Sequence, residues 1–215
     1  PVRFFKMFKY AIAQYRQPRY LFAGIIHIII FAGFIILSLR SITLILIGIS
    51  DGYVLSGLGG TIGHYYTALK DVAATFVLAA CLVAMLRRGI FIPERYAVPP
   101  KYGKDHTWEA IFVLLLITGL VTCDMVFEGS QAAALIQNGL NAHILVPGTG
   151  PWIAANLLSS TPLNNLQIIH LGAYFSHELI FFFFLCFLPL GKHFHVITSL
   201  PNVFFMKLDK GSIKP

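Results

Sequence analysis

The sequence predicts an all-α membrane protein, a bundle of four transmembrane helices with both termini in the cytoplasm. Hydrophobic residues make up 57% of the 215 residues and charged residues only 12%, whereas soluble domains carry about 25% charged residues. Four separate apolar stretches are long enough to cross a bilayer as helices, which takes about 20 residues. We therefore expect one multi-pass domain, residues 1–215, in the cell inner (cytoplasmic) membrane.

The four predicted spans are separated by connections of very different length. Few charges interrupt the spans, and ionisable residues within membranes usually face the bundle interior. After the third span, residues 128–165 contain no lysine or arginine and mix apolar residues with glycine and proline. We expect this segment to be a loop at the outer face. The spans cover residues 20–49, 64–86, 108–127 and 166–190, and the charges within them include Arg40, Lys70, Asp71, Asp124 and Glu178.

Lysine and arginine gather in alternate connections, and cytoplasmic segments are the ones enriched in them. Residues 50–63 and 128–165 contain none. The termini and the middle connection are therefore predicted to face the cytoplasm. The net charge of +7 follows this topology, and no basic face is interleaved with stacking aromatics, so nucleic acid is not an expected partner. The basic residues of the predicted cytoplasmic segments are Arg3, Lys6, Lys9, Arg16 and Arg19, then Arg87, Arg88, Arg95, Lys101 and Lys104, then Lys192, Lys207, Lys210 and Lys214.

The three cysteines each lie alone in an apolar run, at Cys81, Cys123 and Cys186. No CxxC motif is present. An iron–sulfur cluster or a zinc site built by this chain is therefore not expected. We interpret the cysteines as buried apolar residues.

Histidines are concentrated in the stretch "HLGAYFSHELIFFFFLCFLPLGKHFHV", residues 170–196. Seven residues separate His170 from His177, and eighteen separate His177 from His195. The three share one helical face if the helix continues past Pro189, and His177 and His195 are then about 27 Å apart along its axis. Such rings cannot bind one small ion together, but they can anchor separate groups across the membrane.

Two further histidines lie in the first two spans. His27 lies between Gly24 and Gly33, small residues that allow something bulky to approach closely. His64 opens the second span on the outer side. One interpretation is that each histidine simply hydrogen-bonds a neighbouring helix. The other is that neutral imidazoles from facing helices ligate haem iron; zinc fits less well, because it needs several ligands close together.

Several motifs resemble those of a membrane b-type cytochrome family. The family includes the gamma subunit of respiratory nitrate reductase and the membrane subunits related to heterodisulfide reductase. The pattern His170-x6-His177-x11-Pro189-x2-Lys192-x2-His195 resembles its last span. The resemblance covers roughly residues 16–206. Its other pieces are "GIIHIIIFAGF" in the first span, "RRGIFIPERY" in the cytoplasmic connection, "TGLVTCDMVFEG" at the end of the third span, and "SLPNVFF" after the fourth.

The resemblance implies two haems b, each held by two histidines, that pass electrons between membrane quinone (menaquinone or ubiquinone) and a cytoplasmic iron–sulfur subunit. His177 and His195 match the paired ligands of the last span, and His27 matches a first-span ligand. Where the nitrate reductase type has a second histidine on an early helix, this sequence has Leu37. The fourth ligand is then expected at His170 or at His64.

The resemblance leaves the ligand pairing open. We expect His27 with His195 on the cytoplasmic side, and His177 with His64 or His170 on the outer side; His64 and His170 are a further possible pair. Arg40 and Lys70 are expected to bind haem propionates. The alternatives are that they extend to the membrane interface or form salt bridges, or that Lys70 and Asp71 relay protons to a quinone.

The leading hypothesis is an electron-transfer subunit whose partners are membrane lipid, quinone and an iron–sulfur subunit. Two other functions are alternatives to it. One is a transporter or proton channel that uses histidines as relays, although no internal repeat typical of transporters is present. The other is a haem-free membrane anchor. In each case the chain itself contains no evident catalytic site for another substrate.

Overall fold

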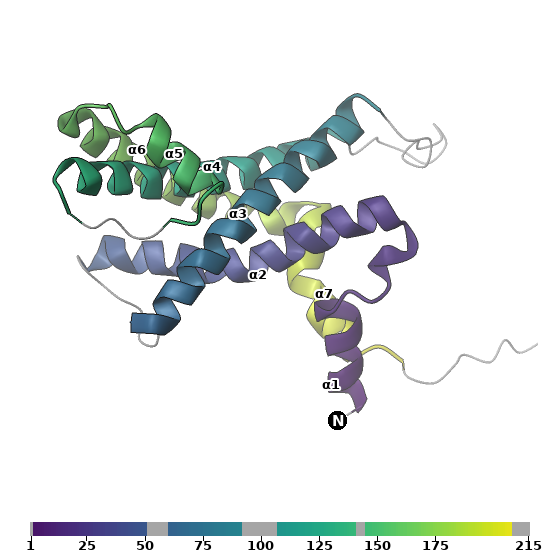
Figure 1. The fold of residues 1–215 in the computed structure, drawn as a ribbon. Helices are drawn as coiled ribbons and strands as arrows, with labels where there is room; N and C mark the ends of the chain where they lie inside the picture. The colour runs from purple at the N-terminus through teal and green to yellow at the C-terminus, as the bar shows by residue number, and fades with distance from the viewer. Residues whose placement is uncertain (1, 51–59, 92–106, 141–144, 208–215) are drawn as a thin grey trace, which may run out of the picture. The chain divides into compact units, whose positions relative to one another are not determined.

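The computed structural model describes residues 2–50, 60–91, 107–140 and 145–207 (Figure 1). Of the predicted cytoplasmic residues, Arg95, Lys101, Lys104, Lys210 and Lys214 lie outside these ranges, and so does the second half of "RRGIFIPERY". The chain divides into two compact units, and each is described by itself. The first unit comprises residues 1–28 and 185–215, and the second comprises residues 29–184.

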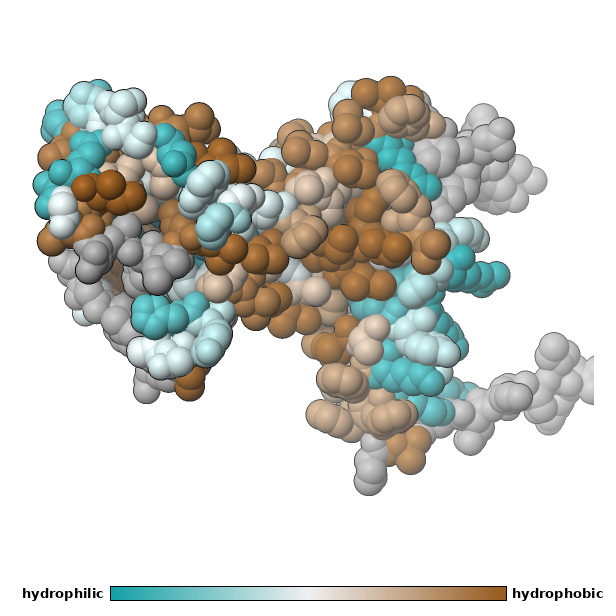
Figure 2. Space-filling model, viewed as in Figure 1, coloured by the Kyte–Doolittle hydropathy of each residue, from teal (hydrophilic) through white to brown (hydrophobic). Residues whose placement is uncertain are grey.

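The predicted all-α class is confirmed. Four helices in the described ranges are long and apolar enough to cross a membrane, and these ranges contain no strand. Figure 2 shows apolar side chains across much of the visible surface, as expected of helices that contact lipid. The chain is therefore a multi-pass membrane protein. Its long helices are α2 (Leu21–Ile49), α3 (Gly60–Gly89), α4 (Thr107–Gln137) and α6 (Leu163–Phe187).

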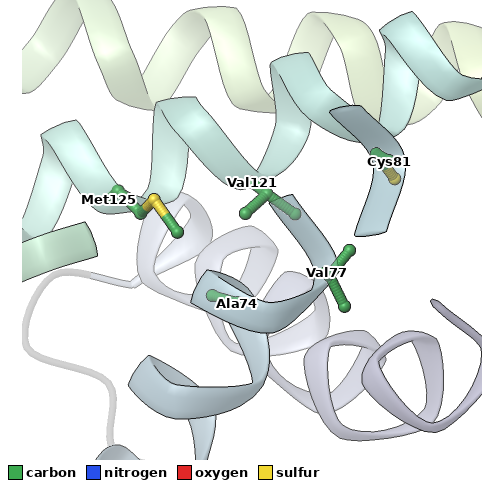
Figure 3. Close-up of a cluster of buried hydrophobic side chains, with 5 residues drawn as sticks. All are labelled: Ala74, Val77, Cys81, Val121 and Met125. Carbon is green, nitrogen blue, oxygen red and sulfur yellow. The ribbon is translucent and has the colours of Figure 1, made fainter. Parts of the chain in front are cut away.

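Within residues 29–184, α3 packs against α4 through small and medium apolar side chains. The cluster consists of Ala74, Val77, Cys81, Val121 and Met125 (Figure 3). Small residues let helices approach closely in a membrane, where dispersion contacts and not water exclusion drive association. Gly33 of α2 serves the same purpose, because a Cβ there would overlap the side chain of Val77. The bulky neighbour expected at Gly33 is thus a valine of α3.

The third span is longer than predicted. We expected a loop from residue 128, but α4 continues to Gln137, and a short helix, α5 (Gly150–Leu157), follows. In Figure 1, α5 lies beside the C-terminal part of α4. Gly129 explains the close packing, because a Cβ there would meet the backbone of α5 at Ala155 at 2.8 Å. Ala132, Ala133 and Ala155 are buried in this part of the chain.

The fourth span does not continue as a helix past Pro189. After α6, a 3₁₀ turn η5 (Leu188–Leu190), an extended Gly191 and a second turn η6 (Lys192–Phe194) lead into α7 (His195–Phe204). Proline lacks the amide proton that the helix needs at that position. The condition for a shared helical face therefore fails for His195, which begins a new helix, and the axial distance of about 27 Å does not apply.

In the unit formed by residues 1–28 and 185–215, α1 (Val2–Met7) lies beside α7. Arg3 Nη1 donates to the carbonyls of Phe204 and Met206, at 3.0 Å each, and so satisfies free carbonyls at the end of α7. A π-helical turn, η1 (Phe8–Ile12), and a 3₁₀ turn, η2 (Gln17–Arg19), connect α1 to α2.

Candidate functional site

Two cations and three carboxylates form one ion cluster inside the second unit, consisting of Arg40, Lys70, Asp71, Asp124 and Glu128. Arg40 binds both carboxylates of α4. Its Nε donates to Asp124 Oδ1 at 2.9 Å, and its Nη2 lies 2.9 Å from Glu128 Oε1. Asp124 and Glu128 are four residues apart, so both face the same side of α4.

Lys70 joins α3 to the same carboxylates. Its Nζ lies 2.9 Å from Asp71 Oδ1 and 3.8 Å from Asp124 Oδ2, and it donates to Glu128 Oε2. The side chains of Lys70 and Asp71 are 2% and 0% exposed, so neither reaches the membrane interface. Burial at this level requires charge pairing, because an isolated buried charge is very costly.

The ion cluster bears on the predicted roles of Arg40 and Lys70. Both are paired with protein carboxylates, as the salt-bridge alternative expects, and snorkelling to the interface is wrong for Lys70. Binding of haem propionates stays a prediction. With three carboxylates and two cations, the cluster has one carboxylate in excess, and it can therefore take up a proton without leaving a cation unpaired.

His177 on α6 is buried, with 3% of its surface exposed. Its Nδ1–H donates to Glu178 Oε1 at 3.0 Å, and its imidazole interacts electrostatically with Asp124. Adjacent helical residues point about 100° apart, which predicts that Glu178 contacts another span. That prediction is wrong, because the carboxylate turns back to the neighbouring ring.

His170, also on α6, is half-buried against α4. Its Nδ1–H donates to the carbonyl of Phe127 at 3.0 Å, and its ring stacks on that of Phe127 with 4.0 Å between centroids. Ser130 Oγ lies 3.4 Å from the same nitrogen. His64, in the first turns of α3, is exposed.

In the first unit, His27 and His195 come from opposite ends of the chain. His27 on α2 donates from Nδ1–H to Gln14 Oε1 at 3.1 Å. His195, at the start of α7, lies close enough to interact electrostatically with His27. The structure thus brings together the two histidines that the sequence predicts as one ligand pair.

His27, His170 and His177 share one feature of hydrogen bonding. In each, Nδ1 lies against an oxygen acceptor and so carries a proton, and the neutral ring then has its lone pair on Nε2. Among the residues that the structure describes, none hydrogen-bonds Nε2 of these rings. Histidines that ligate metals almost always carry such an acceptor on the other ring nitrogen.

Other metal chemistry has less support in the described part of the chain. There, no three or more His, Cys, Asp and Glu side chains lie close enough together to hold a metal ion. Ligation of haem iron needs only two imidazoles. Cys81 is buried as predicted, whereas the same interpretation is wrong for Cys186, which is exposed.

Sequence reasoning missed the three hydrogen-bond acceptors of the histidine rings, which are Gln14, Glu178 and the Phe127 carbonyl. Each becomes recognisable only when its histidine neighbour is placed in space. Glu178 had a weak signal, because a carboxylate beside a histidine in an apolar span has few other partners. Gln14 had none, since it lies in a basic segment that topology already explains.

Comparison with known proteins finds two similar oxidoreductases. The chain is 29% identical over 193 residues to the "Probable iron-sulfur-binding oxidoreductase FadF" of Bacillus subtilis (strain 168), a match that covers 87% of the chain and 24% of that protein. It is 23% identical over 211 residues to the "EtfAB:quinone oxidoreductase" of Syntrophomonas wolfei subsp. wolfei, covering 96% of the chain and 28% of that protein. The chain thus spans about a quarter of the length of these curated relatives. No protein-family model matches the chain, and no solved structure matches it.

Proposed function

We propose that the chain is the haem b membrane part of a redox complex, and that it passes electrons between a cytoplasmic iron–sulfur partner and membrane quinone. The observation that carries this proposal is the shared tautomer of His27, His170 and His177, each with Nδ1 held and a lone pair on Nε2. The two relatives support the redox assignment, since one is named for iron–sulfur binding and the other for quinone.

The residues present fit haem in their donor chemistry. Bound haem supplies one-electron chemistry, and the protein tunes it through the axial ligands, burial and hydrogen bonds. In the first unit, His27 and His195 are the ligand pair, because they approach each other from separate helices. The chain's part is to hold both imidazoles neutral and oriented, and to surround them with apolar residues.

The second ligand pair belongs to residues 29–184. His170 and His177 lie seven residues apart on α6, or about 10 Å along the helix axis. Two rings on one side of one helix cannot reach opposite faces of a porphyrin, because the disc would overlap the helix between them. The pairing of His177 with His170 is therefore dropped, and His64 of α3 is the partner of His177.

The ion cluster supports a quinone site in the same unit. Reduction of a quinone to a quinol takes up two electrons and two protons. Asp71, fully buried beside Lys70, and the excess carboxylate of the cluster are groups that can pass protons to a quinone oxygen. The membrane supplies the quinone, and the iron–sulfur partner supplies or receives the electrons.

A histidine-relay proton channel is the second candidate function. The observation in its favour is that buried His177 lies close enough to Asp124 of the ion cluster to interact with it electrostatically. A channel requires no haem, and a bare membrane anchor requires none either. Haem content therefore separates the first proposal from both alternatives.

The test is a reduced-minus-oxidised optical spectrum of the purified chain. We expect the sharp reduced bands of haem b, and lower haem content in each of the variants His27→Ala, His177→Ala and His195→Ala. His193→Ala, two residues before the proposed ligand His195, is the matched control and should retain haem. Colourless protein from cells well supplied with haem, or unchanged haem in all three variants, would refute the proposal.

A further inference from the structure

Gln14 has an unusual backbone. Its φ of 47° is the one positive value among the described non-glycine residues. The left-handed region disfavours residues with a Cβ, and the polar side chain is also buried, with 6% of the residue exposed. A strained backbone and a buried carboxamide both cost free energy. They persist only where the surroundings hold them.

The turn that carries Gln14 is held against α2 by Gly24. A Cβ on Gly24 would overlap the carbonyl of Gln17 and come within 3.1 Å of Pro18 Cα. Only glycine lets the chain after Gln14 fold back so closely. The group expected to pack closely on Gly24 is thus the backbone of residues 17 and 18 of the same chain. Gly24 lies one helical turn before His27. This packing places the carboxamide of Gln14 at Nδ1 of His27, 3.1 Å away.

We infer that Gln14 is the positioning residue of His27: its Oε1 fixes the Nδ1–H tautomer and the ring orientation, and so prepares Nε2 as a haem ligand. This inference rests on the proposed function, which it deepens. An acceptor on Nδ1 makes an imidazole a stronger electron donor and so stabilises ferric iron. Gln14 therefore lowers the midpoint potential of the haem that His27 binds.

The test uses the full chain in lipid nanodiscs and two substitutions of opposite effect. Gln14→Leu removes the acceptor at similar size, and Gln14→Glu keeps an acceptor and adds negative charge. Gln17→Leu, an exposed glutamine of the same turn, is the matched control. The first measurement is a redox titration of the haems. The second is nitrogen-15 NMR of the His27 imidazole in the reduced, diamagnetic protein, assigned by comparison with His27→Ala.

We expect Gln14→Leu to raise the midpoint potential of one haem and Gln14→Glu to lower it, while the other haem and the Gln17→Leu protein keep the wild-type values. The Nδ1–H signal of His27 should show a strong hydrogen bond in wild type and in Gln14→Glu, and lose it in Gln14→Leu. Shifts of the same sign in both Gln14 variants, or none beyond the control, would overturn the inference.

The NMR measurement separates this inference from the proposed function. If the wild-type chain contains no haem, the proposed function fails, and the ligand-positioning role fails with it. If haem is present but Nδ1 of His27 carries no proton or its signal ignores Gln14→Leu, the inference alone is overturned. If Gln14→Leu does not fold, the inference still requires that Gln14→Glu lower the midpoint potential of the haem that His27 binds.

Discussion

Arg40 Nε donates to Asp124 Oδ1 across 2.9 Å and so joins α2 to α4 within the apolar part of the chain. Both side chains are largely buried, at 13% and 5% exposed. A buried ion pair often adds little net stability, because desolvation offsets the attraction, but removal of one partner leaves an uncompensated charge. Removal of one partner should therefore cost far more stability than the intact pair contributes, and unfolding experiments can detect that cost.

Arg40→Ala should destabilise the chain by about 3–5 kcal/mol, the usual cost of breaking a buried pair. Asp124 and Glu128 would lose a shared cation, and Lys70 alone would face three carboxylates. Thermal unfolding in detergent, followed by circular dichroism, measures the effect. Arg19→Ala, at an exposed position, is the control, and equal melting temperatures for the two variants would contradict the prediction.

Gly33→Leu should destabilise the contact between α2 and α3 by about 1–3 kcal/mol, as overpacking of a close contact does. The added atoms meet the Val77 side chain, which has buried neighbours on its other side. Adding Val77→Ala to the same chain should recover part of the loss. Gly172→Leu is the matched control, because a Cβ there meets nothing within 4 Å.

Glu178→Gln should raise the midpoint potential of the haem in the second unit and leave the first unit's haem unchanged. The carboxylate accepts a hydrogen bond from His177 Nδ1 at 3.0 Å, and a neutral carboxamide is a weaker acceptor. Redox titration of both haems measures the shift. Gln14→Leu acts on the haem of the first unit, so each variant is the control for the other. If Glu178→Gln shifts the potential of the first unit's haem instead, the ligand assignment is wrong.

His64→Ala should remove about half of the haem, because His64 is the partner of His177 on a facing helix in our assignment. The haem between His27 and His195 should remain. Haem per chain, determined by the pyridine haemochrome method, gives the result. His193→Ala serves again as control, and full haem content in His64→Ala would place the fourth ligand elsewhere.

Asp71→Asn should slow quinone reduction about 100-fold or more, the usual contribution of a positioned proton donor, with haem content unchanged. Asp71 is fully buried beside Lys70, so its loss interrupts proton delivery and not electron supply. Stopped-flow oxidation of the dithionite-reduced chain by a short-chain menaquinone measures the rate. Glu109→Gln at the start of α4 is the control, and equal rates in both variants would exclude Asp71 from the proton path.

The span prediction succeeded where local hydrophobicity decides the structure, and it was less accurate where packing decides. The apolar length of each stretch indicated α2, α3 and α6 within a few residues. The extension of α4 past Phe127 was missed, because "EGSQAAALIQ" has no strong apolar run. Its small residues become informative only when α5 is seen against Gly129.

The expected pairing of His27 with His195 did not come from helix periodicity; in the structure the two rings lie close enough to interact electrostatically. Periodicity placed His195 on the face of α6, and the break at Pro189 and Gly191 made that placement wrong. A proline ends a helix predictably, whereas the direction in which the chain continues depends on its new contacts.

By itself, the sequence determined the membrane class, the approximate positions of the long helices and most of the ionisable residues within them. These properties follow from transfer free energies that act residue by residue along the chain. Tertiary structure alone decided the distant partners: Glu128 for Arg40 and Gln14 for His27. Hydrogen bonds and ion pairs act over a few ångströms in space, so a partner 13 or 88 positions away along the chain, as Gln14 and Glu128 are, is chosen only when the helices pack.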